Sequence, residues 1–156
     1  DLFYQGIRPA ISVGLSVSRV GSAAQIKAMK QLAGKIKLEL ARYRELAAFA
    51  QFGSDHDAET RKFLERGGRI VELFKQKQYN PLSVEIQVAV LWAMQNNYFD
   101  PIPIVKVKDF QLRLTEYLQT RQADLLANIL REKQVTDEIA KRLKQAVDDF
   151  AASYKA

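Results

Sequence analysis

From residue 26 to residue 154, apolar side chains recur at intervals of three and four with few interruptions. The first such run consists of Ile26, Met29, Leu32, Ala33, Ile36, Leu40, Tyr43, Ala47 and Phe49. This spacing places apolar side chains on one face of an α-helix. Helices that each carry an apolar stripe must bury those stripes against one another. The pattern therefore predicts an all-α fold, an antiparallel bundle of about five helices.

Start and stop signals divide this region into separate helices. We expect helices at 26–52, 57–66, 84–97 and 109–133 and from a Thr136 cap to about 154, with a further turn or two at 69–76. Ser22 and Gln25 have the spacing of a capping box before the first helix. Gly53 is expected to end that helix, and Ser54 or Asp55 to cap the next one. Gly67 and Gly68 are expected to break the second helix.

The capping and packing of two later helices also follow from local signals. Ser83 is expected to cap the 84–97 helix. That helix is apolar on nearly every side, which predicts that it is the buried central one.

Residues 1–25 have a different pattern. Ile11, Val13, Leu15 and Val17 alternate with small polar residues, which favours a half-buried extended segment. So few residues cannot form a sheet alone, so we expect this segment to be the edge of a domain whose body is missing. The chain begins with Asp1 rather than Met, which favours a fragment or a processed product. We expect two units, residues 1–25 and residues 26–156.

Composition excludes several kinds of chemistry. The chain of 156 residues has no cysteine, which excludes disulfides and thiol nucleophiles. The single histidine, His56, excludes zinc sites built on histidine pairs and argues against a hydrolase triad. We interpret His56 as a solvated loop histidine, and we expect no metal site. The longest apolar run, Val88 to Met94, is too short to cross a bilayer.

The positive charge is concentrated in the first expected helix. The formal net charge is +6, and residues 26–52 hold six basic and two acidic side chains, a net of +4. Lys27, Lys30, Lys37 and Arg44 lie near one helix face, and such a face either docks on phosphates or is simply solvated. One hypothesis is therefore a stand-alone basic helical module that binds nucleic acid or a protein partner. A salt-dependent gel shift with short DNA would favour it.

Known phosphate-binding motifs are absent from the sequence. There is no G-x-x-x-x-G-K-[ST] loop and no G-x-G-x-x-G. Arg8 and Arg19 are the only cations among the first 25 residues, and both sit on backbone rich in Gly and Ser. An arginine on such a loop suits bidentate contact with phosphate oxygens, and a structural role fits as well.

Longer stretches of the sequence resemble a known family. Residues 6–11, 13–25, 29–31, 38–40, 47–55 and 76–79 resemble the alpha subunit of the rotary proton-driven ATP synthase. The resemblance extends over essentially the whole chain and is strongest in the first 55 residues. It implies that residues 1–25 are the edge of a truncated α/β nucleotide-binding domain, followed by the helical C-terminal domain. Ser12 departs from the family pattern, which usually has Asn or Asp there.

The resemblance also implies a role in catalysis at a neighbouring subunit. In this family, alpha subunits alternate with catalytic beta subunits in a six-membered ring. The family's arginine finger falls on Arg19, whose fork of donors offsets charge on the transferred phosphoryl group. Ser16 matches a position needed for activity, and we expect it to shape the Arg19 loop.

A second implied site is the non-catalytic nucleotide site of the alpha subunit. In the family, Gln76 and Gln78 line the adenine pocket, and Arg8 with Pro9 lies beside it. Amide side chains suit this role because each offers a donor and an acceptor to a base edge. The implied ligands are ATP or ADP with Mg in the full complex. We expect no cofactor in the isolated chain and no ATP hydrolysis by it.

The implied partners are beta subunits, the gamma subunit of the central rotor stalk, and the peripheral stalk or delta subunit through the missing part. Residues 49–57 resemble the segment near the rotor, although Phe49 and Phe52 also fit an ordinary core. On this reading no nucleic acid is bound. The location is peripheral, on the cytoplasmic face of a bacterial plasma membrane or the equivalent organellar inner membrane. The related beta subunit is disfavoured, because residues 18–21 and the Gln76/Gln78 pair resemble alpha.

Overall fold

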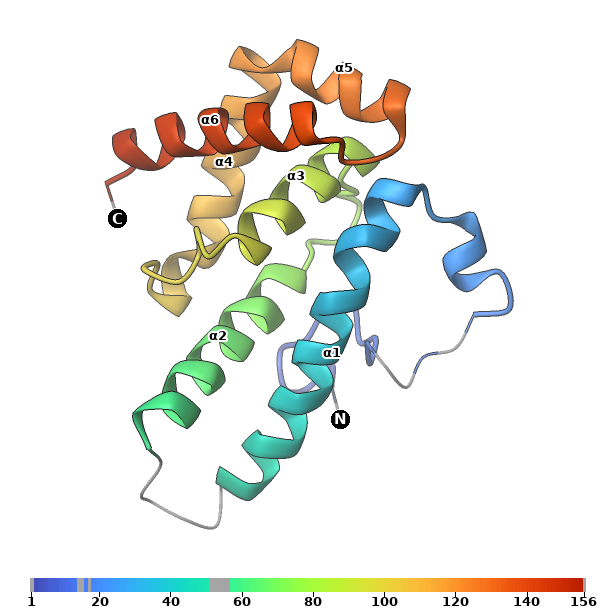
Figure 1. Ribbon diagram of the computed structural model, residues 1–156. Helices are drawn as coiled ribbons and strands as arrows, with labels where there is room; N and C mark the ends of the chain where they lie inside the picture. The colour runs from blue at the N-terminus through green and yellow to red at the C-terminus, as the bar shows by residue number, and fades with distance from the viewer. Residues whose placement is uncertain (1, 14–15, 17, 51–56, 156) are drawn as a thin grey trace.

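The computed structural model describes residues 2–13, 16, 18–50 and 57–155, and among these residues it contains helices and no strand (Figure 1). The helices are α1 (Lys27–Ala50), α2 (Ala58–Phe74), α3 (Val84–Gln95), α4 (Val107–Arg121), α5 (Ala123–Glu132) and α6 (Asp137–Ser153), with short 3-10 turns η1 (Gly21–Ala24) and η2 (Ile104–Lys106). The predicted all-α bundle is confirmed. None of the helices in the described part combines the length and the apolar character needed to cross a bilayer.

Helix α3 is the centre of the molecule, as its sequence predicts. It packs against α1 on one side and against α4, α5 and α6 on the other (Figure 1). Its buried residues are Ile86, Val88, Ala89, Val90, Leu91, Trp92, Ala93 and Met94. A helix that is apolar all round cannot present a wet face, so the amphipathic helices must surround it.

Helices α1 and α2 run antiparallel and contact each other closely (Figure 1). The predicted break at Gly67 and Gly68 is wrong, because α2 continues through both residues. Gly67 is buried, and a Cβ atom there would lie 2.1 Å from Cδ2 of Tyr43. The glycine therefore lets the Tyr43 ring of α1 approach the backbone of α2. This tertiary contact outweighs the low helix propensity of glycine.

The predicted single helix over 109–133 is also wrong, since two helices form there. The break lies at Gln122, whose backbone leaves the helical region with φ −130° and ψ 31°. The break redirects the chain, and α5 buries Leu125, Leu126 and Ile129. Burial of this stripe explains why six α-helices, rather than about five, form in the described residues.

The helix caps follow the sequence in part. Thr136 caps α6 as predicted, its hydroxyl accepting a hydrogen bond from the N–H of Ile139 at 3.2 Å. Ser83 stands at the predicted N-cap of α3, although its side chain makes no capping bond. Asp57 caps α2, because its carboxylate accepts from the N–H of Thr60 at 2.6 Å.

The prediction that Ser22 caps the first long helix is wrong. Ser22 lies inside η1, and Gln25 is extended before α1 begins. The N–H of Ala28, in the first turn of α1, donates to the carbonyl of Lys133 at 2.8 Å. A group distant in sequence thus satisfies an N–H of the first turn, which has no partner within its own helix.

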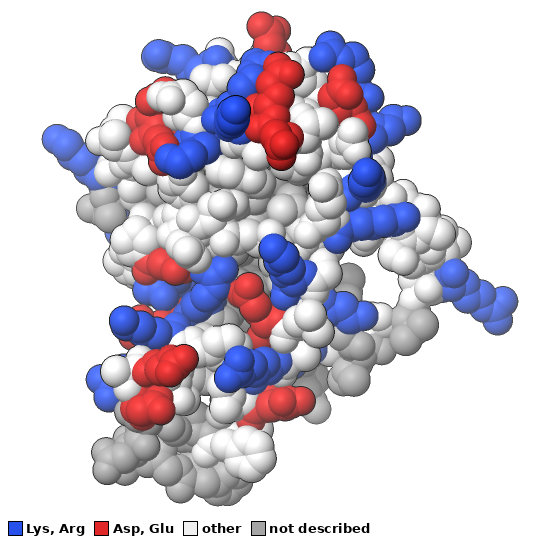
Figure 2. Space-filling view, in the orientation of Figure 1, with Lys and Arg blue, Asp and Glu red and all other residues white. Residues whose placement is uncertain are grey.

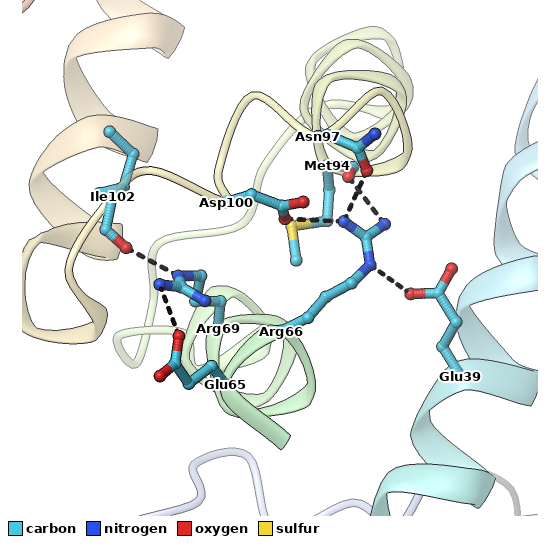
Figure 3. Close-up of polar contacts among 8 residues, drawn as sticks. All are labelled: Glu39, Glu65, Arg66, Arg69, Met94, Asn97, Asp100 and Ile102. Carbon is cyan, nitrogen blue, oxygen red and sulfur yellow. Dashed lines mark hydrogen bonds and ion pairs between the residues drawn. The ribbon is translucent and has the colours of Figure 1, made fainter. Parts of the chain in front are cut away.

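Arg66 of α2 joins three parts of the bundle (Figure 3). Its Nε donates to Glu39 of α1 at 2.9 Å, and its Nη1 contacts Asp100 at 2.8 Å. It also donates to Asn97 Oδ1 at 2.9 Å and to the Met94 carbonyl at 3.1 Å. Burial lowers the pKa of Arg66, but the hydrogen bonds and charges of Glu39 and Asp100 outweigh this and raise the pKa above its ordinary value. The paired guanidinium thus fixes α2 against α1 and the end of α3.

Residues 2–25 form turns, bends and η1 rather than a strand in the part that the structure describes. The alternating pattern predicts an extended segment, but no neighbouring strand is present to pair with it. Several residues named from the sequence lie outside the described residues: Leu15, Val17, Phe52, Gly53, Ser54, Asp55 and His56. Phe49 lies within them and is 74% exposed, so it is not a core residue of this chain.

Candidate functional sites

Arg19 lies on an exposed bend immediately before η1. Figure 1 shows this part of the chain as a loop that stands away from the helices beside the start of α1. Within the described residues, the Arg19 guanidinium forms no hydrogen bond or ion pair. Its five donors are therefore available to a ligand or to another chain.

One serine side chain shapes this loop, and it belongs to Ser18 rather than to Ser16, which the resemblance singled out. The hydroxyl of Ser18 accepts a hydrogen bond from the N–H of Gly21 at 3.0 Å, which closes a turn around Arg19. The N–H of Ser16 donates to the carbonyl of Ser12 at 3.0 Å, and the Ser16 side chain is exposed. The general tendency of serine to bond backbone three residues away could have pointed to Ser18. The role of Ser16 stays a prediction.

Gln76 and Arg8, which are 68 positions apart, meet in the structure. The N–H of Gln76 donates to the carbonyl of Arg8 at 2.7 Å, and its Nε2 donates to the carbonyl of Asn80 at 2.8 Å. The Arg8 guanidinium stacks over the Phe3 ring, 4.1 Å from the ring centroid. Two segments that the resemblance assigns to one nucleotide pocket are therefore adjacent.

The other two predicted nucleotide-binding residues flank this contact. Gln78 lies two residues beyond Gln76 on the exposed loop between α2 and α3. Pro9 follows Arg8 directly and is exposed, and its carbonyl accepts from the N–H of Ile11 at 2.8 Å. No hydrogen bond in the described part of the chain joins this group to the Arg19 loop. The predicted residues thus form two groups.

A cavity of about 160 Å³ opens beside Gln76, between the end of α2, helix α3 and helix α4. Its lining residues are Leu73, Phe74, Lys75, Gln76, Leu82, Gln87, Val90, Leu91 and Gln111. The lining is mixed, with five apolar residues beside the side chains of three glutamines and Lys75. A flat, partly polar group such as a nucleobase suits this kind of lining.

Lys108 of α4 lies next to this cavity, and sequence reasoning missed it. Its Nζ donates to the carbonyls of Leu73 and Lys75 and to Oε1 of Gln111. Burial lowers the pKa of Lys108 to about 8; the charge of Glu72 opposes this shift and that of Lys75 adds to it. A lysine at the start of an amphipathic helix carries no sequence signal for such a role.

The basic face of α1 is partly used inside the chain. Arg44 donates from Nη1 to the hydroxyl of Ser12 at 2.8 Å and to the carbonyl of Val13 at 2.7 Å. Lys27 donates to Gln134 at 2.9 Å. On the face shown in Figure 2, basic and acidic side chains are interspersed. Arg44 therefore holds the N-terminal segment, and basic side chains do not form a continuous band on the face drawn in Figure 2.

The loop that carries Gln76 and Gln78 offers groups that suit the base of a nucleotide. The amides of Gln76 and Gln78 can face the donors and acceptors of a base edge. In the described ranges, no group of three or more His, Asp or Glu side chains is placed to hold a metal ion. No glycine-rich phosphate loop occurs in the sequence.

One comparison with known proteins identifies the family. The family model for the ATP synthase alpha/beta chain, C terminal domain, matches residues 25–150. The match includes Gln76 and Gln78 and every α-helix of the bundle except the last three residues of α6. It does not include Arg8, Pro9, Ser16 or Arg19. With most of its length matched, the chain belongs to the family of C-terminal domains of ATP synthase alpha and beta chains.

Proposed function

We propose that this chain is the C-terminal part of an alpha subunit of the proton-translocating ATP synthase, which makes ATP from ADP and phosphate using a proton gradient. The choice of alpha over beta rests on residues 18–21, Ser-Arg-Val-Gly, and on the Gln76/Gln78 pair. The subunit alternates with beta subunits in a ring around the gamma subunit of the rotor stalk. Through its missing part it contacts the peripheral stalk or the delta subunit. The complex lies on the cytoplasmic face of a bacterial plasma membrane or the equivalent organellar inner membrane.

The observation that carries the catalytic part of this proposal is the state of Arg19. The side chain is exposed on a loop that stands away from the bundle, and it has no partner in the described residues. An arginine finger needs such a free guanidinium, because it must reach the γ-phosphate held by another subunit. Its planar fork of donors offsets the charge that spreads over the phosphoryl oxygens during transfer.

The contact between Gln76 and Arg8 supports the second part of the proposal, a non-catalytic nucleotide site. It brings the Gln76–Gln78 loop to the Arg8–Pro9 turn, so that these side chains can surround one adenine ring. The bound species is ATP or ADP with Mg²⁺, whose phosphates lie outside this chain. Phe49, exposed at the end of α1, is suited to contact the rotor stalk.

The arginine finger is tested in a complex assembled from complete alpha, beta and gamma subunits. We expect Arg19→Ala to lower multisite ATP turnover by about 10³-fold or more, since arginine fingers contribute about 10³ to 10⁵ in rate. Arg19→Lys should recover only part of the rate, because it keeps the charge and loses the fork. Arg131→Ala, at an exposed arginine of α5, is the matched control. Normal turnover by an assembled Arg19→Ala complex would refute the assignment.

The nucleotide site is tested by replacing Gln76 and Gln78 together with Ala. We expect fewer adenine nucleotides to be retained per complex after gel filtration, with beta-site chemistry affected only indirectly. Gln119→Ala, at an exposed glutamine of α4, is the control. Unchanged nucleotide content in the double variant would contradict the assignment of this pocket.

A further inference from the structure

The last turn of α2 is held from outside by a single amine. Lys108, in the first turn of α4, donates from Nζ to the carbonyl of Leu73 at 2.8 Å and to the carbonyl of Lys75. It also donates to Oε1 of Gln111, on its own helix, at 2.9 Å. An ammonium group has three N–H donors, and here each has one acceptor. The Lys108 side chain is therefore fully engaged at this point.

The acceptors are groups that α2 cannot satisfy by itself. The last carbonyls of a helix have no N–H partner within the helix, and cations near this end also interact favourably with the helix dipole. Leu73 and Lys75 lie at this end. Lys75 pairs with Glu72 as well, but that contact lies within the end of α2 itself. Lys108 instead fixes this end relative to another helix.

The direction of the chain after Lys75 decides where Gln76 and Gln78 lie. Residues 76–81 are all exposed, so packing restrains them little. The N–H of Gln76 must stay in place to reach the carbonyl of Arg8 at 2.7 Å. A shift of the Lys75 carbonyl would be passed on directly to this N–H, because the two groups belong to the same peptide unit.

We infer that Lys108 is a positioning residue for the adenine pocket, one that holds the end of α2 so that the backbone of the Gln76–Gln78 loop stays beside the Arg8–Pro9 turn. This inference rests on the proposed nucleotide site. Lys108 itself touches no nucleotide. It acts through the carbonyls of Leu73 and Lys75, and the Gln111 side chain beside it forms part of the adjacent cavity wall.

The test uses the complete subunit in the assembled complex, with Lys108→Met as the main variant. Methionine keeps the unbranched shape and removes all three donors. Lys108→Gln, which keeps an amide donor at shorter reach, is the second variant. Lys106→Met, at an exposed lysine two residues away, is the control. Hydrogen–deuterium exchange of the amides of residues 75–80 is measured first, followed by retention of adenine nucleotide.

In residues 75–80, the amides of Lys75, Gln76 and Asn80 are hydrogen-bonded. We expect these three amides to exchange about tenfold faster or more in Lys108→Met, as the loss of hydrogen bonds to a charged donor predicts. Lys108→Gln should give an intermediate increase, and α3 should exchange as in the wild type. Nucleotide retention should fall in the same order. Lys106→Met should change neither quantity.

The two measurements separate this inference from the function on which it rests. Unchanged exchange in residues 75–80 in either neutral variant would overturn the role of Lys108. Faster exchange in α3 as well would also overturn it, since that result means general loosening of the bundle. Faster exchange confined to 75–80, with nucleotide retention unaltered, would support Lys108 as the holder of this loop and refute the adenine assignment instead.

Discussion

The described residues of the helical region, 26–50 and 57–155, and those of the first segment, 2–13, 16 and 18–25, are held in place by different forces. The helical region buries aliphatic and aromatic side chains from all six α-helices, with α3 at the centre. In the first segment, no described residue is fully buried. That segment is attached mainly through polar contacts, those of Arg44 with Ser12 and Val13 and of Gln76 with Arg8, while the half-buried Val13 side chain packs against the core.

This difference separates stability from the proposed function. The proposed arginine finger, Arg19, lies in this first segment, where few core contacts restrain the chain. So do Arg8 and Pro9, which form half of the proposed adenine pocket. The other half lies on the α2–α3 loop, which Lys108 connects to the bundle. Changes in the core should therefore alter unfolding, and changes at the attachments should alter the segment without unfolding the bundle.

The largest change in the free energy of unfolding should come from Phe110→Ala. The ring lies 4.8, 5.1 and 4.9 Å from the rings of Phe99, Phe150 and Tyr154, measured between centroids. Removing a buried phenylalanine should lower the free energy of unfolding by about 3–5 kcal/mol, from the lost burial and the cavity left behind. Tyr4→Ala, at a side chain that is 91% exposed, should change it by less than about 0.5 kcal/mol. Urea unfolding followed by circular dichroism measures both, and similar losses in the two variants would remove the distinction between the regions.

The second largest effect should come from Gly67→Ala, which we expect to lower the free energy of unfolding by about 2–3 kcal/mol through overpacking. The new methyl group would overlap the Tyr43 ring, whose Cδ2 lies 2.1 Å from the position of a Cβ atom. Gly34→Ala is the matched control, because a Cβ there meets nothing within 4 Å and should stabilise α1 by about 0.5–1 kcal/mol.

A double-mutant cycle with Tyr43→Ala tests whether the clash with the Tyr43 ring causes the loss of stability in Gly67→Ala. We expect Gly67→Ala to cost less in the Tyr43→Ala background, since the clash is then gone. If the cost is the same in both backgrounds, the close approach of the ring is not its cause.

A smaller, pH-dependent effect is expected from Tyr98→Phe. The Tyr98 hydroxyl donates to Asp148 of α6 at 2.6 Å, which should contribute about 1 kcal/mol. Burial, followed by the hydrogen bond and charge of Asp148, raises the pKa of Tyr98 to about 12 from its ordinary value of 10.0. Below pH 10 the Tyr98 phenol is protonated in both the folded and the unfolded state, so the hydrogen bond makes its full contribution to stability. Between pH 10 and 12 the unfolded state loses the proton first, and the contribution declines.

Unfolding of the wild type and of Tyr98→Phe at a series of pH values from 8 to beyond 10 checks this sign. The difference in unfolding free energy between the two proteins should be constant up to about pH 10 and should shrink above it. A difference that grows above pH 10 would contradict the expected direction of the pKa shift.

The smallest effect on global unfolding should come from Arg44→Ala, at less than about 1 kcal/mol. The loss of its bonds to Ser12 and Val13 should instead release the first segment. Limited proteolysis should cut the chain before residue 25 several-fold faster, while the helical region resists as before. Lys37→Ala, at an exposed lysine of the same helix, should leave the cleavage rate unchanged. A loss of stability as large as that of Phe110→Ala would show that the segment is part of the core after all.

The amino-acid sequence by itself determined where most helices lie and which faces they bury. The spacing of apolar residues predicted the buried α3 and the long α1, and the residue type at position 136 predicted the Thr136 cap of α6. Both signals work because helix periodicity and capping depend on residues close together in the chain. The residues of the two proposed sites came from the resemblance to the ATP synthase family, since spacing alone offered no more than two arginines on a loop rich in Gly and Ser.

Only the tertiary structure decided the features that join distant parts of the chain. Gly67 stays helical because it accommodates Tyr43, and the chain bends at Gln122 so that α5 can bury its apolar stripe. The contact of Gln76 with Arg8 and the hold of Lys108 on the end of α2 likewise depend on groups brought together by packing. Local propensities for glycine, lysine and glutamine carry no information about such partners, because the free energy of these contacts exists only once the helices have assembled.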